Sequence, residues 1–217
     1  DNELNNDNWS KVIGNGHAQG IGGWGNNEQQ FYADSTNNLS VEDGCLRITA
    51  LVEDAQDDYG QYSYTSAKID SYQKIDFEND GRITVKFRNP IGQGLWPAIW
   101  MMPEDDTYGG WPKSGEIDIM ELVGGGTVND RTVYGTIHWD DSGNHASYGG
   151  SKSLSTGTFA DEFHVFSITW DASSINFLLD DVVYRTANLT PPELSEFHEN
   201  FFFIFNVAVG GNWPGSP

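Results

Sequence analysis

Three acidic residues lie close together in one short segment of the chain, Ser114-Gly115-Glu116-Ile117-Asp118-Ile119-Met120-Glu121-Leu122. Its apolar alternation is typical of a β-strand, in which successive side chains point to opposite faces. Glu116 and Asp118 therefore share one face, and the isoleucines share the other. Glu121 breaks this alternation, because in a regular strand it would point into the apolar interior. We predict a β-bulge near Met120, whose extra residue returns Glu121 to the face of Glu116.

The bulge would set two carboxyl groups at a distance that is useful for hydrolysis of glycosidic bonds. Roughly four residue rises of about 3.3 Å separate the Cα atoms of Glu116 and Glu121 by about 13 Å. If each side chain reaches about 4 Å toward the other, roughly 5 Å remains between the carboxyl groups, which is the spacing of retaining glycosidases. Asp118, between them, would repel a charge on Glu116 and share a proton with it.

The acid spacing alone is a weak signal. Acids make up 32 of 217 residues, so about 0.7 matches to three specified positions are expected by chance. A solvated acidic strand is the alternative. The apolar alternation and the tryptophans on either side of the strand favour the catalytic interpretation.

Tryptophans suggest the kind of substrate. An indole ring offers a rigid, amphipathic surface for the C–H face of a sugar, so tryptophan beside carboxylates indicates a carbohydrate site. Trp170, in the apolar segment Ser167-Ile168-Thr169-Trp170, is predicted to lie in the core instead. The candidates for substrate contact are Trp96, Trp100, Trp111, Trp139 and Trp213.

Three polar residues are further candidates for substrate binding. His138, within Gly135-Thr136-Ile137-His138-Trp139, could bond the nucleophile region or a sugar hydroxyl. Asn26 alternates with its neighbours in a polar stretch, and Arg88 does so at the end of a predicted strand. A structural role for the histidine and a general surface role for the other two remain alternatives.

Composition excludes several classes of partner. Eleven basic against 32 acidic residues give a formal net charge of −21, which would repel nucleic acid, anionic membranes and sulfated glycans. No run of 18 apolar residues suggests a membrane span. The single Cys45 cannot form an intrachain disulfide and is predicted to be a buried thiol.

Period-2 alternation recurs along the chain, separated by turn signals such as Asp43-Gly44 and Asp180-Asp181. Helix is limited to a predicted turn at residues 193–199, and residues 14–27 and 141–157 are predicted rim loops. Many short strands without βαβ alternation predict one antiparallel sandwich or jelly roll. The nine predicted strands are residues 39–51, 65–69, 81–87, 96–102, 116–122, 133–139, 163–170, 175–179 and 201–209.

Four blocks of sequence together resemble glycoside hydrolase family 16 in its bacterial laminarinase branch: residues 94–101, 115–121, 136–139 and 208–215. The resemblance implies an all-β fold, a concanavalin-like β-jelly-roll sandwich of two antiparallel sheets with a concave substrate cleft. It implies endo-cleavage of laminarin-type β-1,3-glucan with retention, and extends to mixed-linkage β-glucan. It assigns Glu116 as nucleophile, Glu121 as acid/base and Asp118 as the auxiliary carboxylate.

The resemblance also sets expectations for the domain and its surroundings. Residues 1–217 are expected to form one catalytic domain that lacks the family's first and last strands, with the exposed sheet edges open to contact with another chain. No cofactor is required, and the carbonyl of Gly44 is the remaining candidate ligand for a structural calcium ion. A polymeric substrate implies a secreted protein. The alternatives are a non-catalytic glucan-binding module and another neutral-polysaccharide specificity in the same family.

Overall fold

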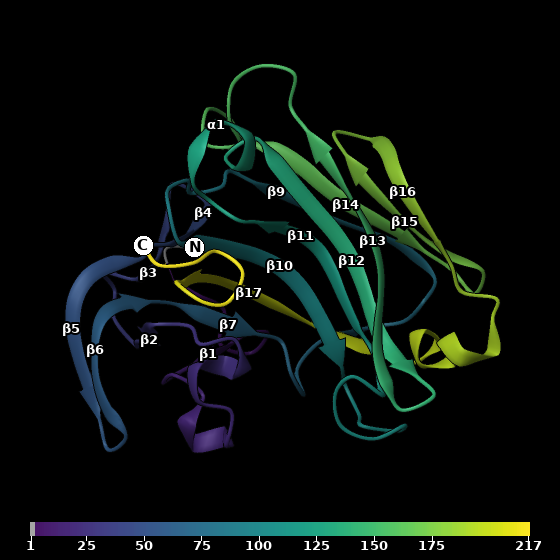
Figure 1. The fold of residues 1–217 in the computed structure, drawn as a ribbon, viewed down its shortest axis with the longest axis horizontal. Helices are drawn as coiled ribbons and strands as arrows, with labels where there is room; N and C mark the ends of the chain where they lie inside the picture. The colour runs from purple at the N-terminus through teal and green to yellow at the C-terminus, as the bar shows by residue number, and fades with distance from the viewer. Residues whose placement is uncertain (1–2) are drawn as a thin grey trace.

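Two antiparallel sheets dominate the computed structural model, which describes residues 3–217. The strands of the large sheet cross the middle of Figure 1 in the order β1-β7-β17-β10-β11-β12-β13, and β8 pairs with β17 beside this path. Their bounds are β1 (Ser10–Val12), β7 (Lys68–Asp70), β8 (Asp76–Phe77), β10 (Leu95–Pro103), β11 (Glu116–Leu122), β12 (Thr132–Asp141), β13 (Asn144–Ser153) and β17 (Phe201–Val209).

The second sheet has the order β16-β15-β14-β9 and packs against one face of the large sheet. Its strands are β9 (Gly81–Phe87), β14 (His164–Trp170), β15 (Ser174–Leu179) and β16 (Val182–Asn188). Two smaller sheets complete the strands: β2 (Gln30–Tyr32), β6 (Gly60–Ser66) and β5 (Leu51–Asp57), and the hairpin of β3 (Leu39–Glu42) and β4 (Cys45–Ile48).

Helical structure is confined to short pieces. The helix α1 spans Gly126–Asn129, and 3-10 turns cover His17–Gln19, Gly22–Gly25 and Pro192–His198. The last of these confirms the predicted helical turn, and its proline at the first turn suits a helical start. None of the described helices is long and apolar enough to cross a membrane.

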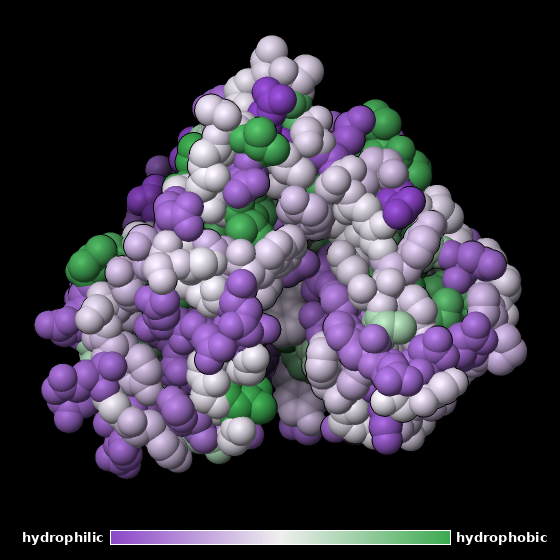
Figure 2. Space-filling view, in the orientation of Figure 1, coloured by the Kyte–Doolittle hydropathy of each residue, from purple (hydrophilic) through white to green (hydrophobic). Residues whose placement is uncertain are grey.

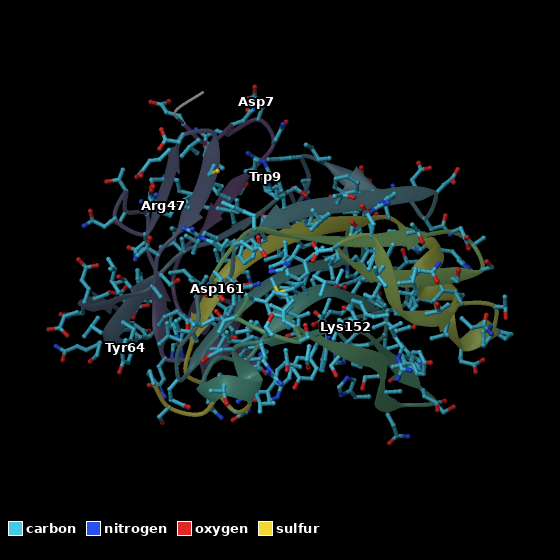
Figure 3. All side chains as sticks on the ribbon, turned by 90° about the horizontal axis from the view of Figure 1, so that it is seen from above. Asp7, Trp9, Arg47, Tyr64, Lys152 and Asp161 are labelled. Atoms are coloured by element: carbon cyan, nitrogen blue, oxygen red, sulfur yellow. The ribbon has the colours of Figure 1, made fainter. Side chains whose placement is uncertain are left out.

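The main core fills the space between the two large sheets. Ile99, Met101 and Ile117 of the large sheet are buried against Phe166 and Phe177 of the second sheet. Trp170 lies in the same core, as predicted, and its indole N–H donates to the carbonyl of Phe197 at 3.0 Å. Figure 3 views the molecule from above and shows side chains filling the space between the curved strands.

The predicted bulge is present in β11. On one side Ala98 pairs with Glu121 and Trp100 pairs with Asp118, so one residue of β10 faces two of β11. On the other side, Asp118 faces Thr136 while Glu121 faces Tyr134, so both Ile119 and Met120 stand opposite Gly135. Ile119 and Met120 are both buried in the core. The extra residue therefore changes which face of the sheet Glu121 joins.

Three predictions about local structure were wrong. Residues 144–153, expected in a rim loop, form β13, whose polar sequence pairs with β12 along ten residues. The predicted strand at 39–51 is divided by the Asp43-Gly44 turn into the β3–β4 hairpin. Cys45 is exposed, because β4 lies in this two-stranded hairpin and presents most of its side chains to solvent. Pairing with neighbouring strands thus overrides the weak local pattern.

Gly135 provides a test of the packing opposite the bulge. A Cβ atom at this position would lie 2.6 Å from both a ring carbon of Phe177 and the hydroxyl of Tyr184. We expect Gly135→Ala to lower the free energy of unfolding by about 1–3 kcal/mol through overpacking, as measured by denaturant unfolding. Gly60→Ala is the matched control, since open space surrounds its Cβ position. Equal stability of the two variants would contradict this packing.

Candidate active site

The face of the large sheet that points away from the core carries the three acids. We call it the groove face; it includes Glu116, Asp118 and Glu121 of β11 with Trp96 and Trp100 of β10. The register places His138 beside Glu116 and Trp100 beside Asp118. Figure 2 shows a hollow between two flanks of the molecule, with hydrophilic residues on both sides of it.

Each acid contacts a nitrogen atom of an aromatic side chain. The indole N–H of Trp96 donates to Oε1 of Glu121 at 2.9 Å, and that of Trp111 donates to Oε2 of Glu116. His138 Nε2 lies 3.0 Å from Oδ2 of Asp118, at ion-pair distance but without the alignment of a good hydrogen bond. Asp118 and Glu121 are buried, so these contacts replace much of their hydration.

Burial and mutual repulsion shift the proton affinities of the glutamates. Burial, followed by the charge of Asp118, raises the pKa of Glu116, while His138 and the Trp111 hydrogen bond oppose the rise. Burial, followed by the charges of Asp118 and Glu116, raises the pKa of Glu121 well above its usual range, and only Trp96 opposes it. Two groups favour the charged form of Glu116 and one favours that of Glu121, an asymmetry that suits Glu121 as a general acid.

The charge on His138 is favoured by its surroundings. Burial lowers the pKa of His138, but the contact with Asp118 and the charges of Asp118 and Glu116 outweigh burial and raise it overall. A protonated His138 would offset part of the negative charge of the acids. This makes it the main positive partner of Asp118 on the groove face.

Aromatic rings extend from the acids along the groove face. Trp213 meets Trp96 edge to face, with ring centroids 5.5 Å apart, and meets Tyr134 at 5.0 Å. Trp213 and Trp111 are 44% and 52% exposed, which leaves ring surface free to meet a sugar. The orientation of the Trp100 ring is fixed by a hydrogen bond, because its indole N–H donates to Oδ1 of Asn206 at 2.7 Å.

Two predicted substrate contacts do not lie on this face. Trp139 packs against the main core, because it alternates with His138 along β12 and so points to the other side of the sheet. Arg88 follows β9 in the second sheet and stacks on Phe163, with its guanidinium carbon 5.5 Å from the ring centroid. Alternation along β12 that places His138 on the groove face places Trp139 on the core face, and Arg88 follows a strand of the second sheet.

The wall beside β7 contains a buried lysine that the sequence did not single out. The ammonium of Lys68 lies 4.1 Å from the centroid of the Trp24 ring and 4.9 Å from that of Trp100. Burial lowers its pKa to about 8, against the opposing charge of Glu28. Asn26 is half-buried next to Glu28, toward which its amide donates at 3.4 Å, so it lies beside this wall. The alternation within the predicted strand at residues 65–69 is the one sequence feature that could have indicated which face of the sheet Lys68 joins.

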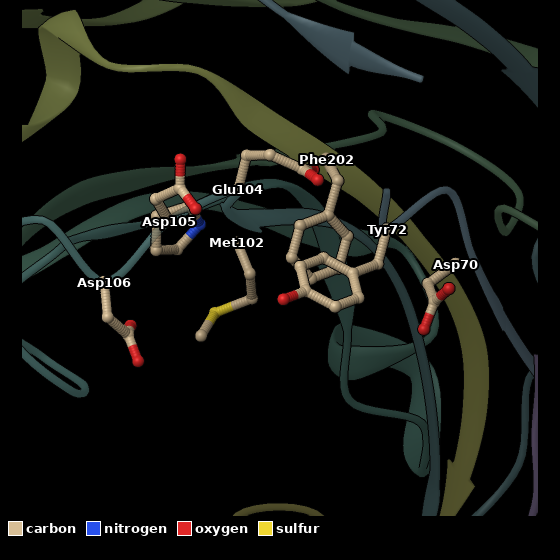
Figure 4. Close-up of a pocket in the computed structure, with 8 residues that line it drawn as sticks. Asp70, Tyr72, Met102, Glu104, Asp105, Asp106 and Phe202 are labelled. Atoms are coloured by element: carbon tan, nitrogen blue, oxygen red, sulfur yellow. The ribbon is translucent and has the colours of Figure 1, made fainter. Parts of the chain in front are cut away.

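A cavity of about 290 Å³ adjoins the β10 and β17 end of the sheet. Its wall includes Tyr72 and Phe202, whose rings lie 4.9 Å apart, and Met102, and its rim is acidic, with Asp70 and Glu104 (Figure 4). Met102 pairs with Phe202, one step along β10 from the residue that faces Ile117. The cavity thus lies at the end of β10 that is nearest to Glu116 in the pairing with β11.

A calcium ion is not supported by the residues around Gly44. Calcium takes six to eight oxygen ligands, whereas Gly44 lies in the tight turn between β3 and β4, and neighbouring Glu42 is paired with Arg47. Among residues 3–217, one group of three acidic or histidine side chains has its possible ligand atoms all within 4.8 Å of one another: Glu116, Asp118 and His138, on the groove face.

A two-sheet sandwich with paired carboxylates in a tryptophan-lined groove defines a class of protein, the glycoside hydrolases. Residues 23–217 match the model of the glycosyl hydrolases family 16, and the chain belongs to this family.

Individual relatives support the same placement. The chain is 38% identical to glucan endo-1,3-beta-glucosidase A1 of Niallia circulans over 89% of its own length, but spans only 30% of that protein. It is 39% identical to glucan endo-1,3-beta-glucosidase of Cryptopygus antarcticus, covering 90% of this chain and 74% of that protein. The solved catalytic domain of the laminarinase from Thermotoga petrophila superposes with a TM-score of 0.89 at 41% identity, covering 100% of this chain and 86% of that one.

The raised pKa of Glu121 makes a prediction about stability. Its carboxyl group keeps a proton when folded at pH values where the unfolded chain has lost it, so folding stability falls as pH rises above the usual pKa. Glu121→Gln removes this cost, and its carbonyl can still accept from Trp96. We expect a higher melting temperature than wild type at pH 7–8 and no difference near pH 4, measured by calorimetry.

The exposed Glu78 offers the control for this comparison. Glu78→Gln should leave the melting temperature within about 1 °C of wild type at both pH values. A loss of stability in Glu121→Gln that is the same at pH 4 and pH 8 would refute the electrostatic explanation.

Proposed function

We propose that this chain is an endo-acting, retaining β-1,3-glucanase. One observation carries the proposal: the bulge in β11 sets Glu121 on the groove face together with Glu116 and Asp118. The relatives described above supply the substrate class, and the neutral sugar chain suits a protein of net charge −21. Secretion is part of the proposal, because a polysaccharide of this kind must be met outside the cell.

The first step of the proposed reaction forms a covalent intermediate. The carboxylate of Glu116 attacks the anomeric carbon, and the bond from that carbon to the bridging oxygen breaks. Protonated Glu121 gives its proton to the departing oxygen, so the leaving sugar departs as an alcohol. Trp111 donates to the carboxyl group of Glu116, which holds it in position for the attack.

The second step returns the enzyme to its starting state. Glu121, now ionised, takes a proton from water, and the water oxygen attacks the anomeric carbon to release Glu116. Two inversions give net retention of configuration. Asp118, paired with His138, adds to the repulsion that keeps the proton on Glu121 before the next attack.

Sugar units would lie across the large sheet, on the aromatic rings of the groove face. Trp96, Trp213 and Trp111 offer ring faces on the side of β11, and Trp100 offers one on the side of β7. His138 is half-buried beside the acids, where a hydroxyl group can reach it. Asn26 can offer its side-chain amide to a sugar hydroxyl on the side of the groove face next to β7.

Substitution of the proposed nucleophile gives the most direct test of the chemistry. We expect Glu116→Ser to lower kcat on laminarin by about 10³-fold or more, because no covalent intermediate can form, while oligosaccharide binding measured by calorimetry persists. The wild-type product should appear first as the β-anomer in proton NMR. Substantial hydrolysis by the variant, or an α-anomer as first product, would refute the assigned roles.

The substrate class has its own assay. Release of reducing sugar from laminarin, with lichenan as the mixed-linkage comparison, should occur without added metal, and product sizes should fall across a broad range from the start, as in endo-cleavage. Binding of laminarin without any release of reducing sugar would instead identify a glucan-binding module.

The platform role of Trp213 predicts an effect on substrate affinity. We expect Trp213→Ala to raise KM for laminarin by about 5- to 30-fold, with a smaller change in kcat, because a buried ring contact is lost without any change in the acids. Phe163→Ala is the matched control, since that ring is 43% exposed and lies just before β14 of the second sheet. An unchanged KM for Trp213→Ala would remove this residue from the platform.

A further inference from the structure

A second histidine, His145 on β13, contacts both His138, the partner of Asp118, and Trp111, the partner of Glu116. Its Nε2 lies 2.8 Å from Nδ1 of His138, whose other nitrogen faces Asp118. Its ring centroid lies 4.8 Å from that of Trp111, the residue that donates to Glu116. A continuous series of contacts therefore runs from Glu116 through Trp111, His145 and His138 to Asp118.

The contact between the two imidazoles restricts where their protons lie. Nδ1 of His138 and Nε2 of His145 face each other at hydrogen-bond distance, so one of the two must carry the proton and the other must accept it. Because Nε2 of His138 faces a carboxylate, that nitrogen keeps a proton in either arrangement. A charged His138 then donates from Nδ1 to His145, its neutral acceptor, and keeps its Nε2 proton on the side of Asp118 at ion-pair distance.

The charges around the pair favour this arrangement. Two acids, Asp118 and Glu116, face His138, whereas one, Asp140, stands opposite His145 in the register between β12 and β13, so the greater negative charge lies beside His138. The pKa of His138 is raised overall, whereas burial and the neighbouring charge of His138 lower the pKa of His145. Glu196 lies near Asp140, and burial raises its pKa to about 7, so it adds little charge at acidic pH.

We propose that His145 is a positioning residue, which fixes the proton of His138 on the side of Asp118 and packs Trp111 against Glu116. The inference rests on the proposed glucanase function and adds to it a residue outside the three acids and the substrate platform. Because His145 acts through His138 and Trp111, its loss should alter kcat and the pH profile more than KM.

Two variants separate the two contacts of His145. His145→Gln keeps a polar group that can accept from Nδ1 of His138 but loses the ring, and His145→Phe keeps the ring on Trp111 but loses the nitrogen. We expect Phe to lower kcat about tenfold or more and to lower the pKa of the alkaline limb of the kcat profile. Gln should restore the position of that limb, with KM for laminarin within about threefold of wild type in both.

Nitrogen NMR of the imidazoles tests the same contact without turnover. In wild type, His138 should titrate at a higher pH than an unperturbed histidine and show protons on both nitrogens below that pH. In His145→Phe its titration should shift to lower pH, and His145→Gln should return it toward wild type. His198, an exposed histidine that contacts the carbonyl of Ala172, is the matched control, and His198→Phe should change none of these readouts.

The outcomes separate this inference from the proposed function. Wild-type kinetics, an unchanged pH profile and an unchanged His138 titration in His145→Phe would overturn the role of His145 while leaving the glucanase intact. Absence of laminarin hydrolysis in wild type would overturn the glucanase, and the NMR titration would still decide whether His145 sets the proton of His138. If the Phe variant does not fold, His145→Leu, which also lacks the acceptor nitrogen, takes its place, and an unchanged His138 titration in it would overturn the inference.

Discussion

The extra residue in β11 is the feature on which the rest of the site depends. In a regular strand Glu121 would point between the sheets, where Ile117 and Met101 are packed, and an ionised carboxyl group there would lack partners. With Ile119 and Met120 both opposite Gly135, the strand keeps its apolar residues in the core and turns Glu121 onto the groove face. Gly135 suits this place because the rings of the second sheet approach its Cα closely.

Collecting three carboxyl groups on one face of the sheet has an electrostatic cost, and the chain offsets it with nitrogen atoms carried on aromatic rings. Trp96 donates a hydrogen bond to Glu121, Trp111 donates one to Glu116, and His138 lies at ion-pair distance from Asp118. His138 and Trp111 both favour the charged form of Glu116, whereas only Trp96 favours that of Glu121. The two indoles also present ring surface to the groove, so the groups that tune the acids are the same groups proposed to bind the sugar.

The sequence predicted the parts of the molecule in which local alternation and tertiary role agree. The bulge followed from the parity of Glu116 and Glu121, and the core position of Trp170 followed from an apolar run. The strand β13 could not be predicted, because its polar residues are ordered by pairing with β12 rather than by burial. Lys68 and His145 could not be predicted for a related reason: each gains its partners only through the pairing of strands in the folded sheet.

A crystal structure of the Glu116→Ser variant with a bound laminarin oligosaccharide tests the central claim most directly. The account predicts that Ile119 and Met120 form the bulge, that Glu121 points into the groove next to Trp96, and that its carboxyl group lies within hydrogen-bond reach of a bridging oxygen. Glu121 should also lie about 5 Å from the position of the wild-type Glu116 carboxyl group. A Glu121 side chain directed between the sheets, or a separation of about 9 Å, would contradict it.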